Sequence, residues 1–374
     1  MTAVTAPMKK TRLSAIMFFY IGRQFFVWFI AVFFLFAALI FMIDMIELLR
    51  RSSGKPDVTF DLVLTMAATK LPLLTQVTMP FAILFGGMMA FWRLNRSSEL
   101  VSIRASGVSI WQILAPALII ALLIGVFRLA ALNPVASVMH AKWQQLESRY
   151  LKGRSSFMAL SNTGVWLRQM DKDGQSVIHA ASVSPSKLLL HQVMVLLYKG
   201  EDRFSTRIDA KTAVLRKGHW ELRDVSLFSP QTGTSKLAVY RMKTDLTLDK
   251  IQESFSSPET ISFWELPRFI RELEAAGFSA LNHKLRYHSL TAEPLLFCAM
   301  ILIAAVFSLR HNRKTGAVIA IAGGIITGFM LFFVSKLILN FGGSGSLPVV
   351  LAAWIPTGAS AMLGLTALLH LEDG

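Results

Sequence analysis

The sequence is poor in cysteine and in charge. Its one cysteine, Cys298, lies in an apolar run and has no partner for an internal disulfide. Because disulfides are permitted but not required outside the cytosol, this leaves the compartment open. Charged residues make up 16% of the 374 residues, whereas a soluble globular chain carries about 25%. This shortage of charge argues against a soluble enzyme.

Motifs for nucleotide, metal and nucleophilic chemistry are also missing. The chain has no G-x-x-x-x-G-K-[ST] phosphate loop and no H-E-x-x-H, and its eight histidines do not cluster with other ligands. An S-x-x-K match at Ser184–Lys187 falls in an expected turn and lacks the accompanying motifs. We therefore expect no catalytic residue, no metal and no cofactor in this chain. Nucleic-acid binding is not expected either, because the isoelectric point of about 10.1 is not accompanied by a basic run.

The charge that is present divides the chain into two regimes. Residues 133–286 hold 22 Lys/Arg and 15 Asp/Glu, a density that matches soluble proteins. The other 220 residues hold only 16 Lys/Arg and 8 Asp/Glu. The sequence thus predicts a water-soluble domain inserted into a membrane protein.

Six apolar runs reach the length of about 20 residues that crosses a bilayer. They are residues 16–43, 62–92, 110–132, 289–309, 315–340 and 348–370. The first is too long for the apolar core of a cleaved signal peptide. Nine basic residues flank the runs on one side, namely Lys9, Lys10, Arg12, Arg93, Arg96, Arg104, Arg310, Arg313 and Lys314, and three on the other, Arg50, Arg51 and Lys55. The positive-inside rule therefore predicts cytoplasmic termini and an external domain.

Between the third and fourth runs the pattern is typical of β-structure. Five stretches rich in branched and aromatic residues, 177–183, 188–198, 205–215, 220–228 and 236–248, are separated by turn residues. Residues 216–219 resemble a hairpin turn, and the whole predicts an antiparallel sandwich or open barrel. Residues 261–276 have helical apolar spacing and predict an amphipathic helix leading back to the membrane. The expected parts are 1–133, 134–260, 261–285 and 286–374.

Four charges, Lys70, Arg128, Glu293 and Lys336, lie in the outer half of the predicted spans. Because unpaired charges are costly in a bilayer, they either snorkel to the interface or face a cavity or one another. Three cations and one anion in an apolar vestibule would suit an amphiphile with anionic head groups, such as a phosphorylated glycolipid.

Three more charged residues, Asp44, Glu47 and Arg51, share one helical face at the outer end of the first run. Paired carboxylates can perform acid–base or metal chemistry. The i, i+4 spacing of Glu47 and Arg51 favours a surface ion pair instead.

The cytoplasmic segment 93–107 contains a short amphipathic helix by its pattern. Ser97 or Ser98 can cap it, Glu99 is favourable in its first turn, and Leu100 contributes to a small apolar face. Such a helix either docks into the groove of a cytosolic partner or simply connects two spans.

This segment resembles a motif of the LptF/LptG permeases of the lipopolysaccharide export ABC transporter. The family pattern R-S-E-L-x-x-x-x-A-S-G is matched by Arg96–Val101 and Arg104–Ser109. The resemblance covers nearly the whole chain and includes Pro72, Pro80, Leu132-Asn133-Pro134, Trp220-Glu221-Leu222, Glu293-Pro294 and Leu347–Pro356. Tyr20-Ile21 and Ile43-Asp44 look more like the G-type than the F-type subunit.

The resemblance implies an α-helical membrane protein with six transmembrane helices (3+3) and an inserted periplasmic antiparallel β-jellyroll. It also implies extraction of lipopolysaccharide from the bacterial inner membrane. The implied partners are an LptB-type ATPase dimer that binds ATP and Mg, an LptF-type sister permease, an LptC-type membrane-anchored jellyroll and an LptA-type periplasmic bridge. A G-type subunit itself would hold no cofactor.

Site residues follow from the same resemblance. A coupling helix at about 95–107 would contact the ATPase through Arg96, Glu99, Leu100 and Arg104. Lipopolysaccharide phosphates would be held by basic residues, here Arg50, Arg51, Lys70, Arg128, Lys142, Arg149 and Lys336. This chain departs from the family where Phe41 and Leu73 replace lysines.

Three alternatives stay open at this point. The chain is an F-type subunit, an envelope scaffold or sensor anchored in the membrane, or a membrane enzyme acting on a lipid-linked sugar through Asp44, Glu47 and Glu293.

Overall fold

The computed structural model describes most of the chain. The described residues are 14–55, 58–151, 165–171, 174–184, 189–199, 203–216, 218–229, 233–244, 257–275, 279–309 and 316–373. They divide into a helical unit, Met1–His140 with Ser262–Trp264 and Lys284–Gly374, and a β unit, Ala141–Ile261 with Glu265–His283. The helical unit is therefore assembled from both ends of the chain, with the β unit inserted between them.

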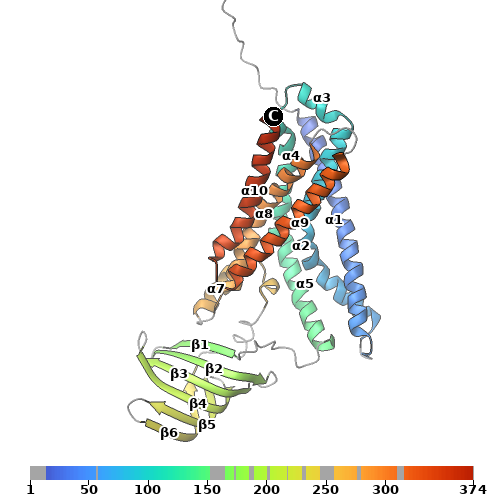
Figure 1. Cartoon of the computed structure of the whole chain (residues 1–374). Coiled ribbons are helices and arrows are strands. Elements are labelled where there is room, and N and C mark those ends of the chain that lie inside the picture. Colours follow the sequence, from blue (N-terminus) through green and yellow to red (C-terminus); the bar gives the residue numbers. More distant parts are fainter. Residues whose placement is uncertain are drawn as a thin grey trace, which may run out of the picture. The chain divides into compact units, whose positions relative to one another are not determined.

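Six helices of the described chain are long and apolar enough to cross a membrane. They are α1 (Ala15–Ser52), α2 (Phe60–Arg96), α4 (Ile110–Phe127), α8 (Leu281–Ser308), α9 (Gly316–Gly343) and α10 (Val349–Asp373). All six predicted runs are thereby confirmed as helices. Within the helical unit, the start of α1, the short helix α3 (Glu99–Ala105) and the end of α10 lie at one end, opposite the α1–α2 turn (Figure 1).

Large apolar side chains and close backbone contacts hold these helices together. Phe25 of α1, Phe91 of α2 and Phe297 of α8 are fully buried in one core. A Cβ added to Gly125 of α4 would lie 2.6 Å from the Cα of Pro294 on α8. Only a residue without a side chain permits this approach, as is common between membrane helices. The third and fourth spans, which come from the two halves of the chain, therefore pack directly on each other.

The third span does not end at residue 132, where the apolar run ends. It continues through the π-helical turn η1 (Arg128–Leu132), α5 (Asn133–Leu146) and the π-helical turn η2 (Glu147–Leu151). The chain is therefore helical where the sequence predicts the start of the β domain, at residue 134.

Proline does not stop this helix because other side chains satisfy the freed backbone. Pro134 has no N–H to donate to the carbonyl of Ala130, which is four residues earlier. The indole Nε1 of Trp264 donates to that oxygen instead, at 3.2 Å. Gln76 Nε2 donates to the carbonyl of Leu132 at 3.0 Å. A π-helical turn at this point relieves the steric clash of the proline ring.

The predicted amphipathic helix after Pro258 exists but begins later than expected. It is α7 (Leu266–Ala275), which buries Leu266, Ile270 and Leu273. Phe263, which the helical spacing counts as part of the apolar face, lies in the preceding turn. Its backbone N–H donates to Asn133 Oδ1 at 2.8 Å, and its ring stacks on Tyr287 at 5.3 Å between centroids.

The β unit contains one antiparallel sheet with its strands in chain order. They are β1 (Val165–Asp171), β2 (Gly174–Ser184), β3 (Leu189–Lys199), β4 (Arg203–Arg216), β5 (His219–Ser229) and β6 (Gly233–Lys243). The fold class of membrane helices with an inserted antiparallel domain is confirmed. The predicted hairpin turn is also confirmed, since Arg216 pairs with His219 around Gly218, whose φ is 78°. Strand β1 is not predicted, because its seven residues carry several polar side chains.

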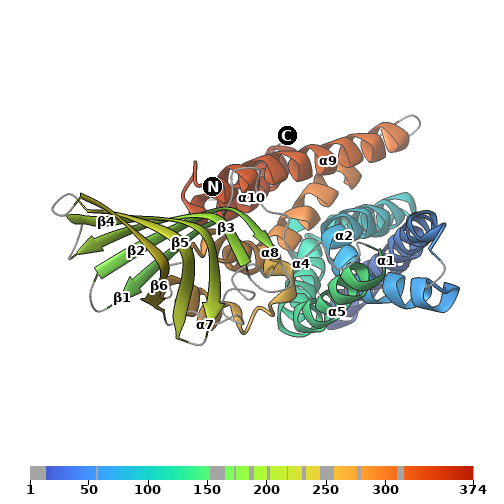
Figure 2. The ribbon, with the colours of Figure 1, turned by 90° about the horizontal axis from the view of Figure 1, so that it is seen from below.

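The sheet curls over one apolar face (Figure 2). The inward-facing positions do not alternate strictly, because Leu190 and Val193 of β3 are both buried. Between them Gln192 has a φ of 48°, and Asp224 of β5 has a φ of 53° at the same row of the sheet. The strand pairing skips this row and resumes in the same register. The inward face thus changes parity along one line that crosses the sheet.

Candidate functional site

The predicted coupling segment is a helix–turn–helix at one end of the helical unit. Helix α2 runs to Arg96, so residues 95 and 96 belong to the second span rather than to the short helix. Ser98 occupies the N-cap position of α3 with a φ of 59°, and its side chain makes no capping hydrogen bond. The hydroxyl of Ser97 donates instead to the carbonyl of Arg93 at 3.0 Å. The predicted side-chain cap is therefore wrong, because Ser97 donates back to α2 and Ser98 makes no capping hydrogen bond.

Helix α3 is anchored on one face and open on the other. Leu100 and Ile103 are 4% and 3% exposed and belong to the same core as Phe91. Val101 is 48% exposed, and Arg104 is also exposed. Leu100, which is predicted as an ATPase contact, is thus buried inside this chain. Val101 is exposed instead and is not among the ATPase contacts predicted from the sequence.

Glu99, another predicted contact on α3, lies half-buried at its first position. Arg96 is exposed and stacks over the ring of Trp92, 5.1 Å from its centroid. The segment therefore presents polar and basic groups on a rigid apolar base.

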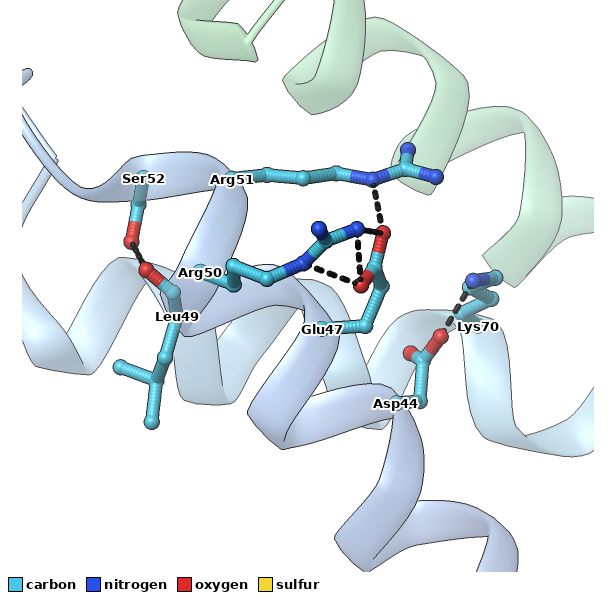
Figure 3. Close-up of polar contacts among 7 residues, drawn as sticks. All are labelled: Asp44, Glu47, Leu49, Arg50, Arg51, Ser52 and Lys70. Atoms are coloured by element: carbon cyan, nitrogen blue, oxygen red, sulfur yellow. Dashed lines mark hydrogen bonds and ion pairs between the residues drawn. The ribbon is translucent and has the colours of Figure 1, made fainter.

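The other end of the unit carries the charged residues of α1 and α2. Helix α1 continues past the apolar run, so Asp44 and the residues after it remain on the helix. The Nζ of Lys70 on α2 forms an ion pair with Asp44 Oδ1 (Figure 3). Their side chains are 22% and 10% exposed. The pair ties α1 to α2 and neutralises a cation that would otherwise lie in the membrane.

Glu47 binds two arginines on the same helix. Its Oε1 accepts from Arg51 Nε at 2.7 Å, and its Oε2 accepts from Arg50 Nε at 2.9 Å (Figure 3). The predicted Glu47–Arg51 ion pair is confirmed. Both arginines keep large exposed surfaces, 76% and 51% of their side chains, so they remain accessible to an anion.

Two of the four charges in the outer half of the spans pair with each other. Arg128 of η1 and Glu293 of α8 form an ion pair, with side chains 3% and 19% exposed. The Arg128 guanidinium also lies 6.0 Å from the ring centroid of Phe297. This agrees with the expectation that such charges face one another rather than lipid. Arg128 is therefore covered by protein.

The remaining predicted lipid contacts, Lys336, Lys142 and Arg149, are exposed residues. Lys336 is exposed on α9, with its Nζ 5.5 Å from the ring centroid of Phe332 one turn earlier. Lys142 of α5 and Arg149 of η2 are exposed residues of the β unit. The described contacts thus link Lys70 with Asp44 and both arginines of α1 with Glu47.

The carboxylates proposed for an enzymatic alternative do not meet. Asp44, Glu47 and Glu293 each pair with a basic side chain. Among the described residues no group of three His, Cys, Asp or Glu could hold a metal ion. Most of the S-x-x-K match, residues 185–187, lies outside the described residues.

Comparison with known proteins agrees with this architecture. The Escherichia coli K12 lipopolysaccharide export system permease protein LptG is 23% identical over 358 residues, covering 94% of this chain and 97% of the relative. The Haemophilus influenzae protein of the same name is 23% identical over 319 residues, covering 82% and 85%. The family model "Lipopolysaccharide export system permease LptF/LptG" matches residues 19–370. The chain therefore belongs to the LptF/LptG family of lipopolysaccharide export permeases.

Proposed function

We propose that this multi-pass inner-membrane permease is the G-type subunit of an ATP-driven lipopolysaccharide exporter. It extracts lipopolysaccharide from the inner membrane and passes it to a periplasmic bridge. The relatives named LptG support the subunit type. The observation that carries the ATP-driven part is α3, a short helix that is anchored by Leu100 and Ile103 and has an exposed outward face.

The assembly proposed around the chain follows the family. An LptB-type ATPase dimer binds ATP and Mg on the cytoplasmic side, and an LptF-type sister permease completes the membrane part. LptC-type and LptA-type proteins receive the lipid in the periplasm. Both termini are cytoplasmic, the β unit is periplasmic, and this chain is a non-catalytic subunit without a cofactor of its own. The nine-to-three distribution of basic residues supports that topology.

Lipopolysaccharide binding is assigned to the basic residues at the outer ends of the spans. Arg50 and Arg51 have the exposed donors that suit bidentate phosphate binding. Lys70 binds phosphate after its ammonium group leaves Asp44. Lys142, Arg149 and Lys336 are exposed and available to the same head groups. Arg128 is buried against Glu293 and contributes by fixing the third span rather than by touching phosphate.

The transport step then proceeds as follows. Lipopolysaccharide enters sideways between the first span of one permease and the fifth span of the other, with acyl chains against apolar side chains. ATP binding in the partner moves α3, the vestibule closes, and the lipid moves toward the β unit.

The coupling part is tested with Glu99→Ala in the purified transporter in proteoliposomes. We expect the lipid released per ATP hydrolysed to fall, because the outward charge that the partner engages is lost. A matched control is Glu272→Ala, which removes an exposed carboxylate of α7 that pairs with Arg268. Unchanged ATPase activity and release in Glu99→Ala would refute the coupling role.

The lipid part is tested by photo-crosslinking of lipopolysaccharide next to position 70. Lys70→Ala should reduce the yield. Asp44→Asn should raise it, because the lysine loses its ion pair with Asp44. Equal yields in all three proteins would show that Lys70 serves the α1–α2 contact only.

A further inference from the structure

The outward face of the β unit carries charged residues that the proposed function leaves unused. Trp220 and Leu222 of β5 are each 1% exposed and belong to the apolar core of the sheet. Because side chains alternate along a strand, Glu221 between them points to the opposite, outward face. Arg241 of β6 is directly opposite Glu221 in the strand pairing, so it lies on the outward face as well. Side chains placed in this way are direct neighbours across the two strands.

Two more arginines of the same face meet the Glu221 carboxylate. Its Oε1 accepts from Arg223 Nη2 at 2.7 Å and from Arg223 Nε at 3.0 Å. Its Oε2 lies 3.9 Å from Arg216 Nε, which comes from the end of β4. The side chain of Glu221 is 15% exposed, whereas those of Arg216 and Arg223 are 56% and 57% exposed. The carboxylate is thus largely covered, and both guanidinium groups remain accessible.

The charge of this cluster is not balanced. Arg241 forms no ion pair or hydrogen bond in the described part of the chain. The pKa of Glu221 is lowered, chiefly by the hydrogen bond from Arg223 and further by the charges of Arg216 and Arg241. Asp224, the next acidic residue along β5, is exposed at the row that the strand pairing skips. Three cations therefore act on one carboxylate, and an arginine cannot relieve the repulsion by losing its proton.

A second charged group on the outward face shows the difference from an ordinary surface pair. Arg207 and Asp209 of β4 form an ion pair at 2.8 Å, with side chains 49% and 45% exposed. Here one cation meets one anion, and both are equally open to solvent. This pair is neutral and has no need of a further anion, so it supplies a matched control.

We propose that Arg216, Arg223 and Arg241 form a phosphate-binding site on the outward face of the β unit. Glu221 is the positioning residue that holds two of these arginines together. A phosphate monoester suits the site because it carries nearly two negative charges and three acceptor oxygens, which guanidinium groups bind in a bidentate manner.

The identity of the ligand rests on the proposed function. The phosphorylated sugar head group of lipopolysaccharide supplies such a phosphate once the lipid has reached the β unit. The site would then hold the head group after its acyl chains have left the membrane. A phospholipid head group offers the same phosphate chemistry with a single charge, and the experiment separates the two sources.

The test places a photoreactive side chain at Val239, which is 47% exposed and opposite Arg223 in the strand pairing. The assembled transporter, supplied with ATP, is reconstituted into three sets of vesicles. The first contains phosphatidylcholine with lipopolysaccharide, the second phosphatidylcholine with phosphatase-treated lipopolysaccharide, and the third phosphatidylglycerol alone. We expect crosslinking to intact lipopolysaccharide, and several-fold less to the dephosphorylated lipid.

Three variants test the arginines themselves. Arg241→Gln should lower the crosslink yield about two- to fivefold, the usual effect of one exposed ionic contact. It breaks no hydrogen bond of the described chain, so the fold is retained. Glu221→Gln should raise the yield, because the amide removes the charge that competes with phosphate. Arg207→Gln, the matched control, should leave the yield unchanged.

Equal yields from intact and dephosphorylated lipopolysaccharide, or equal effects of Arg241→Gln and Arg207→Gln, overturn the inference. Crosslinking to phosphatidylglycerol, or to an acidic protein of the assembly, without crosslinking to lipopolysaccharide also overturns it. If lipopolysaccharide is crosslinked next to position 70 but not at position 239, the proposed function stands and this inference alone fails. If it is crosslinked at neither position, the proposed function itself fails.

Discussion

Removing either member of the Arg128–Glu293 pair should destabilise the helical unit. The side chains are 3% and 19% exposed, so the partner left behind keeps a largely buried charge. Breaking a buried ion pair in this way costs about 3–5 kcal/mol. With an unfolding entropy of about 2.1 cal/mol/K per residue over 374 residues, this corresponds to a fall of about 4–6 °C in melting temperature.

The two single replacements should not be equal. Arg286 is near enough to act on Arg128 electrostatically. Glu293→Gln leaves Arg128 buried without its ion-pair partner and still repelled by Arg286, whereas Arg128→Met removes that repulsion. We therefore expect Glu293→Gln to lower the melting temperature more. Replacing both with apolar residues, Arg128→Met with Glu293→Leu, should restore much of the loss, since well-packed apolar substitutes for buried pairs are often neutral.

The assay is thermal unfolding of the purified chain in mild detergent, followed by the reactivity of the half-buried thiol of Cys298. A double-mutant cycle over the four proteins isolates the pair energy. Single replacements that melt within 1 °C of the parent, or losses that simply add in the double replacement, would refute the assignment of this pair as the link between the third and fourth spans.

Two further predictions concern packing and pH. Gly86→Ala should lower the melting temperature, because the added Cβ would lie 2.7 Å from the Cα of Phe29. Overpacking of this kind costs about 1–3 kcal/mol. Gly358→Ala is the control and should be neutral, because a Cβ at that position meets nothing within 4 Å. The hydrogen bond from Arg223 lowers the pKa of Glu221, so its contribution is present above the carboxylate's ordinary pKa and is lost as pH falls through the lowered value. Melting of Glu221→Gln should therefore depend less on pH between 6 and 3, and identical profiles for the two proteins would contradict this.

Hydropathy was sufficient to find the membrane helices but not all of their ends. The third helix continues beyond its apolar run because Trp264 and Gln76 donate hydrogen bonds to carbonyl groups near Pro134. Those donors come from distant segments of the chain, so no local pattern contains them. The β strands were found by composition, whereas the change of face at Gln192 and Asp224 depends on backbone conformation that strict alternation does not describe.

The candidate sites were predicted unevenly for a related reason. The motif located Glu99 and Arg96 at the correct turn, and helical spacing gave the Glu47–Arg51 pair. Burial of Leu100 follows from which face of α3 packs on α1 and α2, so its anchoring role was not evident.

The sequence by itself determined that this is a membrane protein with six spans and an inserted β domain. The length of an apolar run and the density of charged residues are local properties, so they do not depend on how the helices pack. Only the tertiary structure decided that Lys70 meets Asp44 and that Arg128 meets Glu293. Those pairings depend on the rotation and contact of helices from distant parts of the chain, which packing sets and residue order does not.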